Sequence, residues 1–292
     1  MLAIEPGAGS APVARFIAQA HQPLDINMYL FTDRTLVAAV RATVARGVPV
    51  RILLDRRPYG GRPRGEVRRL RATGAQVHFA PARFTSHAGR YRFDHAKYMV
   101  SGSRAVIGTA NLTWSAFHKN REYLWTARQP AVAAALRTIF RADWENRRAG
   151  PFPRRLLVVS PGATPLLLRA LDQPGPVCVE SEEMGHDRPI LAALRRKGAA
   201  AHVVLPVRLS GYDRRLALGL RRAGVPVRFL PTPYIHAKLI VGDRFAFLGS
   251  ENFSWTSLNR NREVGVILGQ PDAHRLLQRC EGDWVRAQPS GS

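Results

Sequence analysis

The chain has 292 residues, of which 46% are hydrophobic and 22% charged, an ordinary composition for a globular protein that buries a core. Forty-four Lys and Arg residues against 21 Asp and Glu residues give a net charge of +23. This excess predicts a polyanionic partner, either nucleic acid or an acidic membrane surface; an Arg-rich composition with solvated basic faces is the alternative. No run approaches the roughly 18 apolar residues of a membrane span, so no transmembrane segment is expected.

The two cysteines, Cys178 and Cys280, are too few for a disulfide framework. Their apolar or helical surroundings favour buried thiols, and a single bridge is the open alternative. The N-terminal segment lacks the positive charge and apolar run of a signal peptide. The compartment is therefore left open, with the cytoplasm as the default and secretion or the periplasm as alternatives if a leader has been removed.

Helix and strand patterns alternate through the first half of the chain. Val13, Phe16 and Ile17 lie one turn apart, which predicts an amphipathic helix. A helix between two apolar strands then predicts a right-handed crossover with parallel strands. The expected elements are a helix at 11–24, a strand at 24–31, a helix capped by Thr32 or Asp33 and ending at Gly47, a strand at 48–54, a helix at 67–72 and a strand at 76–80.

The second half repeats this order. Strands are expected at 156–159, 177–179, 202–206 and 225–230, with helices at 166–171, 190–196 and 214–223. Glu180 to Met184 takes the place that Met28 to Asp33 has in the first half. Each half closes with a helix that contains Asp-Trp, at 143–144 and 283–284. The linker at 148–153 places a boundary near residue 150, which predicts domains at 1–150 and 151–292.

A gapless internal repeat carries the strongest functional signal. The stretch from His95 to Glu122 matches the stretch from His236 to Glu263 at 11 of 28 positions, where average residue usage gives roughly two matches by chance. The matching residues are mainly His, Lys, Gly, Asn, Trp, Arg and Glu. A repeat kept only for packing retains its apolar positions, whereas this repeat retains reactive residues. It therefore predicts one active site built from two halves.

The spacing within each repeat brings reactive side chains together. On a strand, residues i and i+2 share a face, so His95 lies beside Lys97 and His236 lies beside Lys238. Asn111 and Asn252 follow the next strand. Two imidazoles, two ammonium groups and two carboxamides suit the binding of a tetrahedral oxyanion. The competing interpretation, a metal site, is disfavoured because a Lys on the same face repels a cation.

This pattern resembles the phospholipase D superfamily, whose signature is His-x-Lys-x4-Asp followed by Gly-Ser-x-Asn, present twice. The resemblance implies an α/β fold in which each half is a mixed β-sheet flanked by helices. The two phospholipase D-like repeats would pack about a pseudo-twofold axis around one shared active site. Such a site is complete within one chain, so a monomer is expected.

The resemblance also implies a metal-independent phosphodiesterase that needs no cofactor and passes through a phosphohistidine. His95 is expected to be the nucleophile and His236 the acid. The catalytic set is completed by side chains that stabilise phosphoryl charge or orient the imidazoles, namely Lys97, Lys238, Asn111, Asn252, Glu122 and Glu263. The expected supporting residues are Thr109, Ser250 and Asp243. The first half departs from the signature, because Gly102 stands where its Asp is expected.

The substrate is less constrained, because the family includes phospholipases, phosphatidyl transferases, cardiolipin synthases and nucleases. The basic loops before the first motif contain Arg56, Arg57, Arg90 and Arg92, interleaved with aromatics (Tyr59, Phe84, Tyr91 and Phe93). This favours single-stranded nucleic acid, and hence a nuclease. A phospholipase D that hydrolyses or transphosphatidylates phospholipids, in peripheral contact with a membrane, is the alternative, and a non-catalytic binding module is the third.

Trp114 and Trp255 match across the repeat. Core packing near the asparagines is the favoured interpretation, and a substrate-binding rim is the alternative.

Overall fold

The computed structural model describes residues 1–61, 63–87, 89–151 and 156–289. These residues form two seven-stranded sheets and one two-stranded sheet. In the first sheet β2, β3 and β4 run parallel and the other neighbours are antiparallel. Its order is β1 (Leu2–Ile4), β8 (Tyr123–Ala127), β6 (Arg104–Gly108), β5 (Tyr98–Ser101), β2 (Leu24–Met28), β3 (Val50–Leu54) and β4 (Gln76–Phe79).

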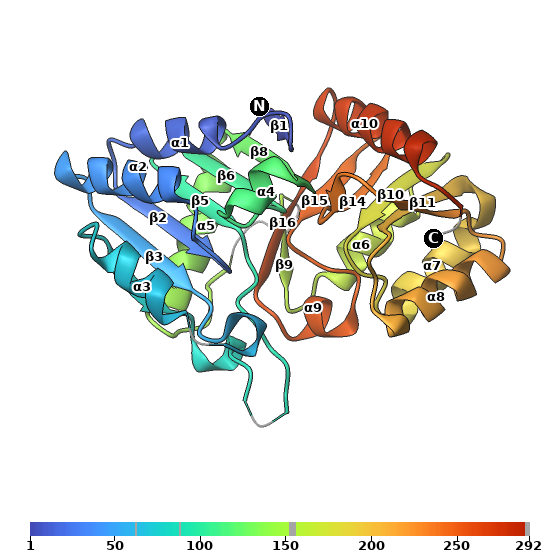
Figure 1. Cartoon of the computed structure of the whole chain (residues 1–292), viewed down its shortest axis with the longest axis horizontal. Coiled ribbons are helices and arrows are strands. Elements are labelled where there is room, and N and C mark those ends of the chain that lie inside the picture. The colour runs from blue at the N-terminus through green and yellow to red at the C-terminus, as the bar shows by residue number, and fades with distance from the viewer. Residues whose placement is uncertain (62, 88, 152–155, 290–292) are drawn as a thin grey trace.

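The second sheet repeats this architecture strand for strand. Its order is β9 (Leu157–Ser160), β16 (Glu263–Leu268), β15 (Ala246–Gly249), β14 (Lys238–Gly242), β10 (Val177–Ser181), β11 (Ala201–Pro206) and β12 (Val227–Leu230). The two halves lie side by side in Figure 1, the first in blue to green and the second in yellow to red. The predicted fold class, two mixed sheets flanked by helices, is confirmed. The boundary near residue 150 stays a prediction, because the expected linker runs into residues 152–155, outside the described ranges.

Helices cover the outer face of each sheet, because every one of these helices has an apolar side that packs on the sheet. The first sheet packs against α1 (Ala11–Ala18), α2 (Arg34–Ala45) and α3 (Arg64–Arg71), and the second against α6 (Thr164–Leu171), α7 (Arg188–Lys197) and α8 (Gly211–Arg222). Asp33 caps α2 by accepting a hydrogen bond from the Leu36 amide at 3.0 Å, as one of the two caps predicted for this helix.

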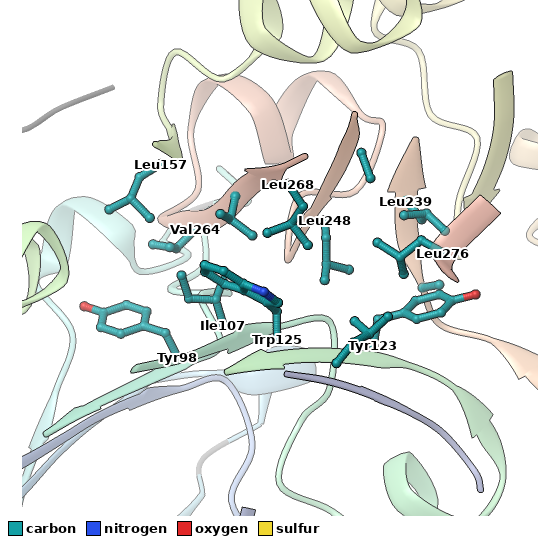
Figure 2. Close-up of a cluster of buried hydrophobic side chains, with 14 of the residues drawn as sticks. Tyr98, Ile107, Tyr123, Trp125, Leu157, Leu239, Leu248, Val264, Leu268 and Leu276 are labelled. Atoms are coloured by element: carbon teal, nitrogen blue, oxygen red, sulfur yellow. The ribbon is translucent and has the colours of Figure 1, made fainter. Parts of the chain in front are cut away.

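A third core joins the two halves. It contains residues of both sheets together with α5 (Pro130–Trp144) and α10 (Asp272–Arg286). Figure 2 shows Ile107 and Trp125 of the first half facing Val264, Leu248 and Leu268 of the second. Because this core is continuous across the pseudo-twofold, the halves are held in one fixed arrangement.

Short segments of the two halves also pair with each other beside the two histidines. The two-stranded sheet pairs β7 (Asn120–Arg121) of one half with β13 (Tyr234–Ile235) of the other. Arg121 pairs with Asp283 at 2.5 Å, and Arg262 pairs with Asp143 at 2.7 Å. Each Asn-Arg-Glu block is therefore anchored to the closing helix of the opposite half, which explains why both the block and the Asp-Trp pair recur.

The interpretation of Cys178 and Cys280 as free thiols is wrong. They form a disulfide that ties β10 to α10, and both residues are fully buried. The partners are 102 residues apart in the chain, so local sequence patterns carry no signal for the pairing.

We expect loss of this disulfide to lower the free energy of unfolding by about 2–4 kcal/mol, because a cross-link that closes a long loop restricts the unfolded chain. Urea unfolding of the oxidised protein, of protein refolded in reductant and of Cys178→Ala/Cys280→Ala measures this loss. The reduced wild type keeps both side chains and so controls for lost packing. Equal midpoints for oxidised and reduced protein would show that the bridge does not form.

Candidate active site

The two histidines occupy equivalent places at the junction of the halves. His95 and Lys97 lie directly before β5, and His236 lies two residues before Lys238, the first residue of β14. Both lysines are buried, and each ammonium group donates to the carbonyl of its own histidine at 2.6 Å. Each Lys thus contacts its own His two residues earlier, although His95, Lys97 and His236 lie just outside the strands on which the sequence places them.

Each imidazole is bound by the glutamate of the opposite half. His95 Nδ1 lies 2.9 Å from Glu263 Oε2, and His236 Nδ1 lies 2.8 Å from Glu122 Oε1. Both glutamates are fully buried. This exchange follows from the segment pairing between the halves, and it makes the site depend on both repeats. With Nδ1 engaged, Nε2 is the nitrogen of each ring that is left for chemistry.

Hydrogen bonds hold both glutamates as carboxylates. Thr109 donates to Glu122 at 2.5 Å, while Ser257 and Asn261 donate to Glu263 at 2.6 and 2.9 Å. Burial alone would raise the pKa of these carboxyls, but the histidines, lysines and hydroxyl groups around them lower the pKa of both below the ordinary value. The carboxylates therefore fix the imidazoles and stabilise their protonated form.

The remaining residues of the repeat lie around the two His–Glu pairs. Ser250 offers its carbonyl to His95 Nδ1 at 3.2 Å, and its hydroxyl accepts from the Val264 amide at 3.0 Å. Asn252 donates to Glu183 at 2.9 Å. The side-chain oxygens of Asn111 and Asn252 are buried and have no hydrogen-bond partner within the described part of the chain. They retain polar capacity that a substrate can use.

Both histidines line one cavity of about 430 Å³, here called the histidine cavity. Its walls are aromatic and acidic rather than basic. The aromatic, acidic and amide side chains that line it with the histidines include Tyr29, Tyr59, Tyr91, Phe93, Glu182, Glu183, Tyr212, Asp213 and Asn252.

Glu182 and Glu183 are site residues that the repeat comparison missed. Glu182 Oε2 lies 2.6 Å from Lys238 Nζ and 3.4 Å from His236 Nε2. Although burial opposes ionisation, the neighbouring His236 and Lys238 lower the pKa of Glu182 to about 2. Burial and the neighbouring Glu182 charge raise the pKa of Glu183 to about 7. The available signal was the segment Glu180–Met184, whose counterpart in the first half has no acidic residue at these two places.

The basic groups of the first half have lowered pKa values. Burial lowers the pKa of His95 below its ordinary value, against the opposing effect of Glu263. Burial also lowers the pKa of Lys97 to about 7. His95 is therefore a neutral imidazole near neutral pH, which is the nucleophilic form.

The arginines expected to bind substrate lie around the histidine cavity, not in it. Arg56 and Arg57 line a separate cavity with Arg64 and Phe79. Arg92 lines a cavity of about 600 Å³, here called the basic cavity, and Arg90 is exposed on the same loop. Of the interleaved aromatics, Tyr59, Tyr91 and Phe93 line the histidine cavity. Phe84 is instead buried in the wall of the basic cavity, where the guanidinium groups of Arg83 and Arg262 lie over its ring, so its expected role in base stacking is corrected.

The interpretation of Trp114 and Trp255 as core residues is wrong. They begin the short helices α4 (Trp114–His118) and α9 (Trp255–Asn259), and 55% and 39% of their surfaces are exposed. Trp114 stacks on His118. Trp255 lines the basic cavity, with the Arg260 guanidinium 4.6 Å from its ring centre. The alternative, an exposed aromatic rim, fits the structure better.

The expected supporting role of Asp243 near the histidines is also corrected. Asp243 is exposed in the turn between β14 and β15. It lies at the opposite end of β14 from Lys238, roughly 15 Å away along a strand of that length. Gly102 takes the corresponding turn with φ of 57°, a left-handed conformation that glycine adopts readily. The missing Asp of the first motif therefore removes no group from the site.

Comparison with known proteins decides the family. A family model described as "Cardiolipin synthase, PLD-like domain" matches residues 13–144 and 188–284. The chain belongs to this phospholipase D-like family. The match includes His95, Lys97, Asn111 and Glu122 in the first half and their counterparts from His236 to Glu263 in the second. No curated protein sequence matches the chain.

Two solved structures share the fold of the phospholipase D-like chain at low identity, and a third is similar to about half of it. A polyphosphate kinase from Porphyromonas gingivalis is 13% identical with a TM-score of 0.71, and covers 97% of this chain and 50% of its own. The chain thus spans half the length of that kinase. A phosphatidylserine synthase from Haemophilus influenzae is 12% identical with a TM-score of 0.66, covering 99% of this chain and 88% of its own. Nuc from Salmonella typhimurium is 21% identical over 51% of this chain and 96% of its own, with a TM-score of 0.44.

The described residues of the phospholipase D-like chain were searched for membrane-spanning helices and for clusters of metal-binding side chains. None of its described helices is long and apolar enough to cross a membrane. The described ranges also contain no group of three or more His, Cys, Asp or Glu side chains arranged to hold a metal ion. The groups that the histidine site does bring together, two imidazoles and two ammonium groups, are suited to phosphoryl anions.

Proposed function

We propose that the chain is a metal-independent phosphodiesterase that cleaves its substrate in two steps through a phosphohistidine. In the first step His95 Nε2 attacks phosphorus, the phosphorus–oxygen bond to the leaving group breaks, and His236 donates a proton to the departing oxygen. In the second step His236 removes a proton from water, which attacks the phosphohistidine and releases His95. The proton on His236 is thereby restored, and one water is consumed per bond cleaved.

The observation that carries this proposal is the exchanged His–Glu pairing. Each imidazole is anchored at Nδ1 by a buried carboxylate of the other half, and both rings line the same cavity. This arrangement leaves two Nε2 atoms for one substrate, one to attack and one to protonate. Lys97 and Lys238 supply the positive charge that a pentacoordinate phosphorane requires.

Single-stranded nucleic acid is the substrate that we favour. The basic cavity shares helix α9 with the histidine cavity, since Trp255 and Asn259 line the former and Thr256 and Ser257 the latter. Its walls carry the guanidinium groups of Arg83, Arg92, Arg148 and Arg260. An exposed indole amid guanidinium groups suits a base and the phosphates that flank it. A strand whose scissile phosphate occupies the histidine cavity could continue across α9 into this basic cavity.

A phospholipid is the second candidate, because the histidine cavity itself favours a cation beside the phosphate. Glu182, Glu183 and Asp213 line it together with Tyr29, Tyr59 and Tyr212. Carboxylates and aromatic faces bind ammonium groups. A head group such as choline or ethanolamine carries its ammonium two carbons from the phosphoester oxygen. The net charge of +23 would favour contact with an acidic membrane surface.

The first test is cleavage of end-labelled single-stranded DNA in excess EDTA by the wild type and by His95→Asn. Choline release from phosphatidylcholine vesicles under the same conditions is the parallel arm. We expect turnover of DNA by the wild type and none by the variant. DNA binding without cleavage, together with choline release, would move the substrate to phospholipids. Turnover of neither, or cleavage that EDTA abolishes, would contradict the proposed function.

A further inference from the structure

The two halves of the site differ at one position that faces the catalytic groups. In the first half Leu24 pairs with Ser101, and in the second Val177 pairs with Gly242. Ser101 and Gly242 are equivalent in the repeat, so Leu24 corresponds to Val177. Counting five residues onward along β2 and β10 makes Tyr29 the counterpart of Glu182. An aromatic ring and a carboxylate thus take the same place in the two halves.

The contacts of these two residues are as different as their chemistry. The Tyr29 ring lies 4.8 Å from the His95 ring, centre to centre, and 5.4 Å from Lys97 Nζ. The Glu182 carboxylate lies 2.6 Å from Lys238 Nζ and 3.4 Å from His236 Nε2. Consequently His236 has a carboxylate near both ring nitrogens, Glu122 at Nδ1 and Glu182 at Nε2, whereas His95 has a carboxylate at Nδ1 alone.

Because of this difference in contacts, the two clusters of charged groups become neutral at different protonation states of their histidines. Below about pH 7, where Lys97 is an ammonium group, the first half holds that one cation and one carboxylate in contact with its histidine, Glu263, so the cluster is neutral when His95 is neutral. In the second half the ammonium group of Lys238 faces the carboxylates of Glu122 and Glu182, so the cluster is neutral only when His236 is protonated. Buried charges are costly unless they are balanced.

We propose that Glu182 gives the site its direction, as a positioning residue whose carboxylate beside Nε2 of His236 makes this ring the proton donor, which leaves His95, with no carboxylate beside its Nε2, as the nucleophile. This inference rests on the proposed two-step reaction and applies to either candidate substrate. The low pKa of Glu182, about 2, keeps its carboxylate ionised, and burial lowers the pKa of His95.

Other charged groups surround His236 and act on it in both directions. Lys97 and Lys238 carry positive charge, whereas Glu122, Glu182 and Glu263 carry negative charge. The other titratable side chains of the site are His95, Glu183, His186 and Asp213, which line the same cavity as His236. Glu122 remains in place when Glu182 is changed, so loss of Glu182 is expected to weaken the proton donor rather than to abolish it.

The test uses substrates that differ in their need for a proton. A nitrophenolate leaves bis(4-nitrophenyl) phosphate without protonation, whereas the alkoxide leaving group of a nucleotide or of choline requires it. We expect Glu182→Gln to lower kcat about 10- to 100-fold for whichever alkyl ester the wild type cleaves, DNA or phosphatidylcholine. For bis(4-nitrophenyl) phosphate the loss is expected to stay within about threefold. Glu281→Gln, which removes a carboxylate paired with His202 at 3.1 Å, is the matched control.

Every outcome separates this inference from the proposed function. If the wild type cleaves none of the three substrates, the proposed function fails before Glu182 is tested. Equal losses on aryl and alkyl esters would overturn the inference and make Glu182 a structural residue or a phosphate-site residue. A gain in activity on the alkyl ester would also overturn it, because Glu182 would then be an anion that occupies the phosphoryl position. Retention of the aryl-ester rate also shows that the variant is folded.

Discussion

Replacing His95 by Asn is expected to lower kcat by at least about 10⁴-fold, because the variant lacks the atom that forms the covalent intermediate. Asn is close in size and its amide can still donate to the Glu263 carboxylate, so the fold should survive. Steady-state cleavage of bis(4-nitrophenyl) phosphate in EDTA measures the loss. His236→Asn is expected to behave differently, with a burst of about one nitrophenolate per chain followed by very slow turnover. Formation of the phosphohistidine can proceed without an acid, because nitrophenolate leaves unprotonated. Its hydrolysis is slow, because the base His236 is missing.

His274→Asn controls for the chemistry of the substitution, because His274 is an exposed helix residue. It should leave the rate unchanged. A burst from His95→Asn and none from His236→Asn would exchange the two roles, and it would contradict the assignment of the nucleophile. Full activity in either variant would contradict a shared two-histidine site.

Loss of the Lys97 charge is the second large effect. The pKa of Lys97 lies near 7 instead of its ordinary 10.5 because of burial, so its ammonium form is present below about pH 7 and is lost as the pH rises through 7. We expect kcat/KM, which reports the free enzyme, to fall on the alkaline side of pH 7. Lys97→Met should lower kcat/KM about 10²- to 10³-fold at pH 6 and remove this alkaline limb, because charge stabilisation of the phosphorane is lost.

Lys119→Met is the matched control, since Lys119 is an exposed lysine beside Trp114. Its pH profile should coincide with that of the wild type. An alkaline limb near pH 7 that persists in Lys97→Met belongs to another group and would contradict this assignment.

The sequence predicted the reactive set because evolution of the repeat left its reactive residues at constant spacing. The i, i+2 spacing predicts that each Lys lies beside its His, although only Lys238 of these four residues lies within a strand. The order of strands and helices also followed from apolar periodicity. Only the reactive residues that occur twice were open to this reasoning.

What the sequence could not predict depends on contacts between the halves. Glu122 and Glu263 were expected to orient the imidazoles, but a linear repeat does not say that each binds the histidine of the other half. Glu182 was missed because comparing repeats finds identities, and its role comes from a difference. Cys178 and Cys280 meet only once β10 and α10 have packed together.

Local pattern also misled where elements were short. The five-residue helices that begin with Trp114 and Trp255 have too few turns to show which side faces the core, so both indoles were placed inside. Asp243 matched the family signature by position, yet it lies in an exposed turn at the far end of its strand. A motif match fixes the position of a residue in the chain. Whether that residue belongs to the site depends on which end of the strand it occupies.

The most direct test of a covalent two-half site is the intact mass of His236→Asn after incubation with bis(4-nitrophenyl) phosphate in EDTA. We expect one added nitrophenyl phosphoryl group per chain, located on His95 by peptide mapping, and none on the His95→Asn/His236→Asn double variant. The absence of any adduct while nitrophenolate is released, or an adduct on a residue other than His95, would contradict it.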